Sequence, residues 1–163
     1  MNVIINGTTR KHAQTHEVCF HIVDHIEGDY LRLDRFTEIP DDYLKGSKVI
    51  DHMGLEKYTN FIFVVPSYYV LPSPVFLNFI NQMSPEQIKG IFSNKRIILV
   101  SVQDSDNLNE IHVDSMRRYF NKIFSFHKVD ARVCIDSCMV NRGLESRKRL
   151  IEVLNEFIKP CLH

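Results

Sequence analysis

Residues 2–26 read NVIINGTTRKHAQTHEVCFHIVDHI, which is a short apolar run, a polar stretch and then a periodic segment. The apolar run, Val3 to Ile5, has the composition of a strand that is buried on both faces. In the periodic segment, apolar residues recur on one helical stripe at Cys19, Ile22, Val23 and Ile26. This order predicts a strand, a loop and an amphipathic helix capped by Thr15, which is the first half of a βαβ unit.

The same alternation continues along the chain. Further apolar runs lie at 30–33, 61–65, 96–102 and 131–135, and helix-periodic segments lie at 74–83, 85–92, 107–124 and 144–158. Alternating strands and helices predict an α/β fold with three α/β/α layers and a five-stranded parallel sheet in the flavodoxin-like order 2-1-3-4-5. No linker or repeat interrupts residues 1–163, so a single flavodoxin-like domain is expected, with 35–57 as a loop that contains one short helix near 49–58.

The charge balance gives no reason to expect nucleic acid or a membrane as a partner. Lys plus Arg equal Asp plus Glu at 20 each. Residues 61–80 carry no charge over about the length of a membrane span, but their three prolines favour a strand, a loop and a helix. No secretory signal is evident at the N-terminus, so a cytoplasmic location is expected.

The cysteines and histidines show no metal-ligand spacing. The cysteines lack a CxxC pair and are expected to be reduced, buried thiols: Cys19, Cys134, Cys138 and Cys161. The second and third of these would lie about 13 Å apart on one strand, which is too far to bridge. A group of histidines at near-helical spacing lacks a third ligand, so solvated positions and no metal are expected for His12, His16, His21 and His25.

The polar stretch at 6–15 lies where a parallel sheet can bind a phosphate. Backbone N–H groups and the positive end of the helix dipole can face an anion there. Gly7 permits a sharp exit from the strand, and Arg10 adds a cation to the hydroxyls of the nearby threonines. A polar loop without a ligand is an equally simple interpretation. Walker and Rossmann glycine patterns are absent, which favours a mononucleotide phosphate.

The residues Asn6-Gly7-Thr8-Thr9-Arg10, followed by Thr15, resemble the NGSxRxxxxT loop of the NAD(P)H-dependent FMN reductase family of flavodoxin-like proteins. After the third predicted strand, Pro66, Tyr68, Phe79 and Ile80 match the family's P-x-Y loop and following helix. The resemblance implies FMN as the cofactor. Its phosphate would bind Thr8, Thr9, Arg10, Gln14 and Thr15, and its ring would lie beside Pro66, Ser67, Tyr68, Tyr69 and Gln103.

The sequence also departs from the family pattern. The Lys, Asp and Arg that the family carries in the helix fall on Leu77, Asn81 and Gln82. The loop at 101–107 contains no glycine, whereas the family's glycines let the backbone pass close to the ring. The segment 103–107 is therefore the feature that distinguishes two hypotheses. One is a flavin-binding protein, and the other is a domain of the same fold that binds another phosphate ligand or a protein partner.

The resemblance implies an enzyme that transfers hydride from NADH or NADPH through bound FMN to a small molecule such as free flavin or a quinone. The cofactor carries this chemistry, so no catalytic side chain is expected, and Tyr68 and Tyr69 would stack on the rings. A homodimer or higher homo-oligomer is implied in the same way. The main alternative is a binding or electron-carrier domain without reductase turnover, although carriers are usually acidic. A phosphate hydrolase or transferase is a weaker alternative, because no nucleophile is found.

Overall fold

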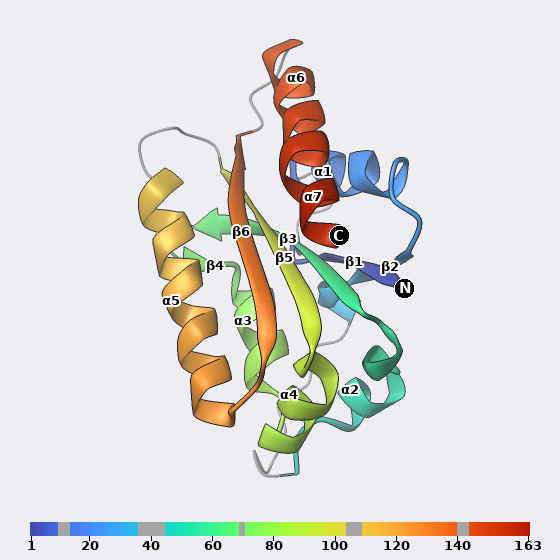
Figure 1. Ribbon diagram of the computed structural model, residues 1–163, viewed down its shortest axis with the longest axis vertical. Coiled ribbons are helices and arrows are strands. Elements are labelled where there is room, and N and C mark those ends of the chain that lie inside the picture. The colour runs from blue at the N-terminus through green and yellow to red at the C-terminus, as the bar shows by residue number, and fades with distance from the viewer. Residues whose placement is uncertain (10–13, 36–44, 69–70, 104–108, 140–143) are drawn as a thin grey trace.

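The computed structural model describes residues 1–9, 14–35, 45–68, 71–103, 109–139 and 144–163 (Figure 1). The strands are β1 (Asn2–Asn6), β2 (Asp29–Arg32), β3 (Asn60–Tyr68), β4 (Leu71–Pro72), β5 (Lys95–Gln103) and β6 (Ala131–Met139). The α-helices are α1 (Gln14–Val23), α2 (Lys48–His52), α3 (Pro74–Asn81), α4 (Pro85–Phe92), α5 (Asn109–His127), α6 (Leu144–Glu152) and α7 (Lys159–Leu162). A π-helical segment, Val153–Ile158, joins the last two.

The main strands are parallel and follow the order β2-β1-β3-β5-β6. Numbered among themselves, these strands have the predicted order 2-1-3-4-5, so the predicted flavodoxin-like fold is confirmed. The short strand β4 was not predicted, and it pairs antiparallel with the end of β3. Because the central strands are parallel, β1, β3 and β5 bring their carboxyl ends to one edge of the sheet, where the order reverses and ligands of such folds bind.

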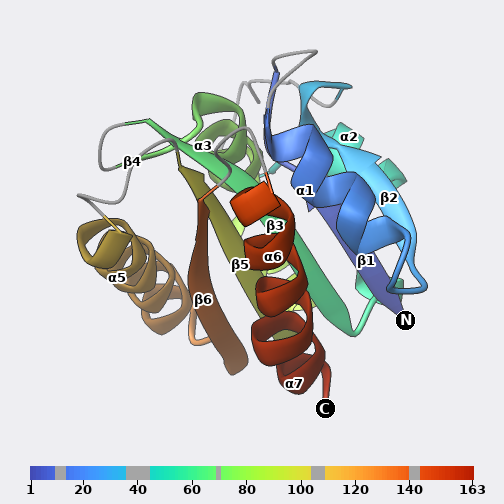
Figure 2. The same cartoon turned by 90° about the horizontal axis from the view of Figure 1, so that it is seen from above.

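Each face of the sheet is buried against a different set of helices (Figure 2). Successive side chains of a strand point to opposite faces, so Val3 and Ile5 enter one core cluster and Ile4 enters the other. Helices α3, α4 and α5 cover the first face, while α1, α6 and α7 cover the second. Each fully buried large apolar side chain contributes about 1.5–3 kcal/mol, which makes the two clusters the main source of stability.

Caps fix the starts of the two helices between β3 and β5. Ser73 and Ser84 are the N-caps of α3 and α4, and each is followed by a proline at the first helical position. Gln87 completes a capping box with Ser84 and also bonds the backbone of Ser47, which holds the segment before α2 against α4. The short helix predicted near 49–58 is α2 with a 3₁₀ turn, Leu55–Lys57.

Three sequence predictions about element bounds were wrong. The first helix begins at Gln14, so Thr15 lies inside it and is not its cap. The segment 144–158 is an α-helix only to Glu152 and continues as a π-helix. Strand β3 continues through Pro66 to Tyr68, where a loop was predicted. Proline is tolerated there because its missing N–H would face the side on which β1 has already ended, at the level of Val64.

The uncharged segment 61–80 forms most of β3, all of β4 and most of α3. This agrees with the predicted strand and helix. Within the described ranges, no helix combines the length and the apolar character that a membrane span needs.

Candidate functional site

The backbone that leaves β1 is held tightly against β3. The Gly7 N–H donates to the Val64 carbonyl at 2.9 Å, which extends the parallel pairing by one residue. A Cβ at Gly7 would lie 3.1 Å from Val65 Cγ2 and 3.3 Å from the Val64 carbonyl oxygen. A side chain at this position would need its neighbours to shift by a few tenths of an ångström, so this close approach, rather than a sharp turn as the sequence suggested, favours glycine.

A second hydrogen bond holds this loop, and its donor lies at the start of α3. The Ser73 hydroxyl donates to the Gly7 carbonyl at 2.5 Å and accepts from the Phe76 N–H at 3.3 Å. One side chain thus caps a helix and holds the loop after β1. Sequence analysis missed this role, because the partners are 66 residues apart in the chain.

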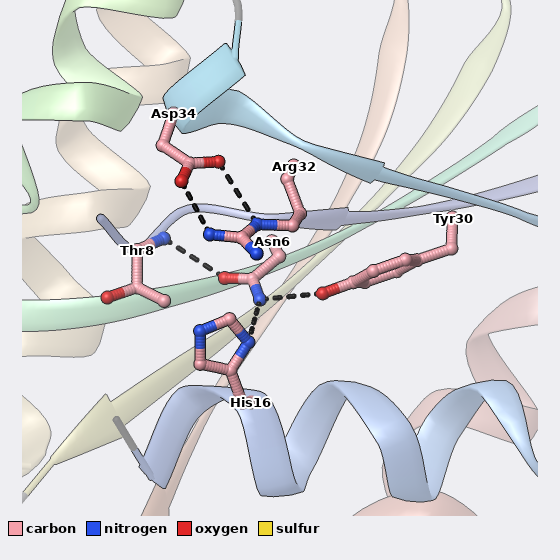
Figure 3. Close-up of polar contacts among 6 residues, drawn as sticks. All are labelled: Asn6, Thr8, His16, Tyr30, Arg32 and Asp34. Carbon is pink, nitrogen blue, oxygen red and sulfur yellow. Dashed lines mark hydrogen bonds and ion pairs between the residues drawn. The ribbon is translucent and has the colours of Figure 1, made fainter. Parts of the chain in front are cut away.

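Asn6 is the centre of a buried polar network (Figure 3). Its Oδ1 accepts from the Thr8 N–H at 3.0 Å, and its Nδ2 lies 2.8 Å from Tyr30 Oη and 2.9 Å from His16 Nδ1. Since an amide nitrogen can only donate, His16 Nδ1 is the acceptor and the imidazole proton of the neutral ring lies on Nε2. Burial raises the pKa of Tyr30, so its hydroxyl remains neutral.

His16 is thus buried and bonded to Asn6, which contradicts the solvated position predicted for it. Its spacing of three residues from Cys19 places it on the buried stripe of α1, a signal that was present in the sequence. His21 is half-buried and His25 is exposed, while His12 lies outside the described residues. The described residues contain no cluster of three metal-ligating side chains.

An ion pair lies beside the network at the end of β2 (Figure 3). Arg32 is level with Asn6 in the sheet, and its Nε and Nη2 approach the Asp34 carboxylate at 3.1 and 2.5 Å. The hydrogen bonds that Arg32 donates to the Asp34 carboxylate raise the pKa of Arg32 further above its usual value. The two opposite charges form an ion pair without net charge near the first loop, and nothing in the sequence pattern had singled it out.

The ends of β3 and β5 contribute a second polar group of side chains. Ser67 Oγ lies 2.5 Å from Ser101 Oγ, and the two residues belong to neighbouring strands. Gln103, the last residue of β5, is only 4% exposed. Neither its Oε1 nor its Nε2 has a hydrogen-bond partner among the described residues. A buried amide without partners costs free energy, so this group is ready to bond a ligand.

The structure places the predicted site residues at the same edge of the sheet, with two exceptions. Thr8, Thr15, Pro66 and Gln103 are buried, Gln14, Ser67 and Tyr68 are half-buried, and Thr9 is exposed. Arg10 and Tyr69 lie outside the described residues, as do residues 104–107 of the third loop. The residues that sequence analysis missed are Asn6, His16, Tyr30, Ser73 and Ser101.

The sheet order and this edge define a flavodoxin-like α/β protein, and solved structures share the fold over nearly the whole chain. An NAD(P)H:quinone oxidoreductase from Methanothermobacter marburgensis has a TM-score of 0.68 at 10% identity, with 94% of each chain covered. An FMN-dependent NADH-azoreductase from Bacillus anthracis, solved with FMN, has a TM-score of 0.62 at 12% identity, covering 99% of this chain and 97% of that one.

Flavodoxin 1 from Bacillus cereus has a TM-score of 0.58 at 14% identity, with 97% of this chain and 96% of that chain covered. No protein-family model and no curated protein sequence matches the chain. At these identities the comparisons establish the fold.

Proposed function

We propose that this protein is an FMN-dependent oxidoreductase that transfers hydride from NAD(P)H through bound FMN to a small-molecule acceptor such as free flavin or a quinone. The observation that carries the proposal is the polar edge of the sheet, where a braced loop follows β1 and a buried, unpartnered amide ends β5. The first suits a phosphate and the second suits the polar edge of a ring.

The phosphate end of the proposed site is the loop after β1 together with the start of α1. The Thr8, Thr9 and Thr15 hydroxyls and the Gln14 amide would donate to phosphate oxygens, and Arg10 would supply a cation. The helix α1 adds its N-terminal backbone N–H groups and the positive end of its dipole. Asn6 would act indirectly, since it fixes the direction of the Thr8 N–H.

The ring end of the proposed site is formed by β3 and β5. Pro66, Ser67, Tyr68 and Tyr69 would border the flavin, with the tyrosines available for stacking on a ring. The Gln103 amide has both a donor and an acceptor without partners in the part of the chain that the structure describes, which fits the alternating N–H and C=O groups of the flavin's pyrimidine edge. The residues present therefore suit the cofactor, although the third loop lacks glycine.

When bound, the flavin would supply the hydride chemistry, which requires no protein acid or base. The proposal therefore assigns no catalytic side chain, and the chain's residues bind, orient and exclude water. The fold shared with an azoreductase described as FMN-dependent and with an NAD(P)H:quinone oxidoreductase supports this assignment. A single domain over residues 1–163, a cytoplasmic location and a homodimer belong to the same proposal.

The test is the visible spectrum of purified protein that has been incubated with FMN and desalted. We expect a retained flavin band that bleaches when NADPH or NADH is added without oxygen. Failure to retain flavin would refute FMN binding. Bleaching that needs no protein would show that the reduction is not enzymatic, so free FMN with each nucleotide is the control.

A second candidate is a flavodoxin-like binding or electron-carrier domain without reductase turnover. The glycine-free segment 103–107 favours it, because side chains there would keep the backbone away from the ring. This candidate predicts a flavin band that is retained and does not bleach with either nucleotide, or a protein that binds a different phosphate ligand. The neutral charge of the chain favours the reductase over an acidic carrier.

A further inference from the structure

The phosphate site proposed above has two described parts, which are the backbone at residues 7–9 and the first turn of α1. Asn6 contacts both of them (Figure 3). Its Oδ1 accepts from the Thr8 N–H at 3.0 Å, and its Nδ2 lies 2.9 Å from Nδ1 of His16, which is the third residue of α1. One side chain therefore joins the loop after β1 to the start of the helix.

The bond from the Thr8 N–H to Asn6 closes a turn at the end of β1. An Asn side chain that accepts from the backbone two residues later sets the direction in which the chain continues. The backbone of Gly7 is bonded on both sides as well, through its N–H to Val64 and through its carbonyl to the Ser73 hydroxyl. These three bonds leave the loop little freedom, so its orientation depends on how firmly Asn6 itself is held.

Two acceptors hold the Asn6 amide. The amide nitrogen has two hydrogens, of which one goes to His16 Nδ1 and the other to Tyr30 Oη at 2.8 Å. With both hydrogens bonded, the amide plane is fixed and Oδ1 faces the Thr8 N–H. Asn6 is fully buried and His16 is only 8% exposed, so water is a poor replacement for a lost acceptor. Removing either acceptor would release the amide and, with it, the turn.

The proposed site is sensitive to such a release because of the groups it uses. Apart from Arg10, the groups assigned to the phosphate are hydroxyls, one amide and backbone N–H dipoles. The ion pair beside the network, Arg32 with Asp34, carries no net charge. A full charge attracts an anion from any direction, whereas a hydrogen-bond donor weakens steeply when it points away. The relative orientation of the loop and the helix therefore matters for phosphate binding.

We propose that His16 and Tyr30 are positioning residues for the phosphate of the flavin. Through Asn6, they hold the loop after β1 in register with the start of α1, and this makes the protein bind FMN more tightly than riboflavin. The inference rests on the proposed function, which names FMN as the ligand. Riboflavin has the same ring and ribityl chain but no phosphate, so the network should affect the affinity for FMN and leave the affinity for riboflavin unchanged.

The first test compares two replacements of His16. In His16→Leu the side chain keeps a similar size and loses its acceptor, so the dissociation constant for FMN should rise about 10-fold. In His16→Asn, Oδ1 is attached two bonds from Cβ, as Nδ1 is in histidine, and can accept the same hydrogen bond. This variant should bind FMN within about 3-fold of the wild-type protein.

Tyr30→Phe and Tyr58→Phe form a matched pair, because each removes one phenolic hydroxyl and keeps the ring. Tyr30→Phe takes away the second acceptor of Asn6, so FMN should bind about 3-fold more weakly. Tyr58 donates to Asp29 at the opposite, amino edge of the sheet, so Tyr58→Phe should leave FMN binding unchanged even where it lowers the Tm. This pair decides the question if His16→Leu does not fold.

The measurement is a fluorescence titration of each protein with FMN and with riboflavin. The affinity for riboflavin should stay within about 2-fold of the wild-type value in every variant. A loss shared equally by both flavins would show that the network only supports the fold, and it would overturn the proposal. Wild-type affinity for FMN in His16→Leu would also overturn it, as would His16→Asn that binds no better than His16→Leu, or equal affinities of the wild-type protein for the two flavins.

A wild-type protein that binds neither flavin would refute the proposed function and move the test of the network to inorganic phosphate. Thermal unfolding is then compared in phosphate and in chloride at equal ionic strength. We expect phosphate to raise the Tm of the wild-type protein and to raise that of His16→Leu by less. An equal rise in the two proteins, or no rise in the wild-type protein, would overturn the positioning role.

Discussion

Asn6 ends β1 and Gln103 ends β5, so both lie at the carboxyl edge of the sheet, but their side-chain amides differ in hydrogen bonding. Asn6 uses its amide in three hydrogen bonds to the protein, whereas the buried amide of Gln103 has no partner among the described residues. The first arrangement stabilises the fold and the second destabilises it. The difference teaches that the polar side chain ending β1 is satisfied by the protein itself, whereas the one ending β5 has hydrogen-bonding capacity that the described residues leave unused.

The largest expected effect is that of Asn6→Leu, which keeps the approximate size of the side chain and removes its hydrogen bonds. The Thr8 N–H and the Tyr30 hydroxyl would lose a buried partner, so the free energy of unfolding should fall by about 3 kcal/mol. Urea denaturation measures the change. Asn155→Ala is the control, because Asn155 is exposed and accepts one hydrogen bond among the described residues, from exposed Lys159. It should change stability by about 0.5 kcal/mol or less. Equal effects would contradict the network's role.

Gly7→Ala should come next, with a loss of about 1–3 kcal/mol. The new methyl group would meet Val65 and the Val64 carbonyl, so β3 and the loop must separate. Gly90→Ala is the matched control, since Gly90 lies exposed in the last turn of α4 and a Cβ there would meet no atom within 4 Å. It should stabilise the protein by about 0.5–1 kcal/mol. Thermal unfolding of the two variants should therefore show shifts of opposite sign, and a stabilised Gly7→Ala would refute the close approach.

Gln103→Leu should have the opposite sign to Asn6→Leu. Replacing a buried amide that has no partner with an apolar side chain should raise the free energy of unfolding of the ligand-free protein by about 1 kcal/mol. Under the proposed function, the same change should weaken FMN binding by roughly 3- to 10-fold, because the ring loses a hydrogen bond. A flavin titration tests the change in affinity, and a urea denaturation curve on the same preparation tests the change in the free energy of unfolding. Lower stability without ligand would show that Gln103 is already satisfied.

The smallest expected effect is a pH dependence of stability that arises from His112, a buried residue of α5 whose Nδ1 has no partner among the described residues. Burial lowers its pKa in the folded protein, so the unfolded chain takes up the proton first. The contribution of His112 to the free energy of unfolding is therefore fully present above the pKa of a histidine in the unfolded chain, about 6.5. It decreases as the pH falls below that value.

His112→Leu tests this dependence and should reduce the loss of Tm between neutral and mildly acidic solution. His21 contributes a loss of the same sign, because its pKa is also lowered by burial. Some acid sensitivity should therefore remain in the variant. An unchanged dependence on pH would show that His112 does not titrate as its burial implies.

The sheet could be predicted from the sequence because its strands are buried on both faces. Runs such as FIFVV at 61–65 must be apolar throughout in a central parallel strand, and the helices between them are long enough to show a period. The end of β3 could not be predicted in this way. Its end depends on the pairing of Ser67 and Tyr68 with β4 and on the point where β1 stops, and neither leaves a periodic signal.

The candidate site was predictable only where its residues are close in sequence. The position of the loop after β1 follows from a strand that meets a helix, whereas the network around Asn6 joins residues from β1, α1 and β2. The packing of these three elements against one another brings the partners together. Residue propensities and sequence spacing do not predict that packing. Sequence reasoning predicted a solvated His16 because it weighed the spacing of the histidines only as possible metal ligands and did not compare His16 with the apolar stripe of the helix.

The Ser73 hydroxyl has a consequence for the rate at which a ligand can bind. Because it holds the Gly7 carbonyl while capping α3, the described part of the first loop is already ordered before any ligand arrives. A partner that must wait for a loop to order associates slowly, whereas a preformed loop leaves the encounter limited by diffusion and access. Under the proposed function, the hydrogen bond from Ser73 would therefore leave residues 7–9 already in place when the cofactor phosphate binds.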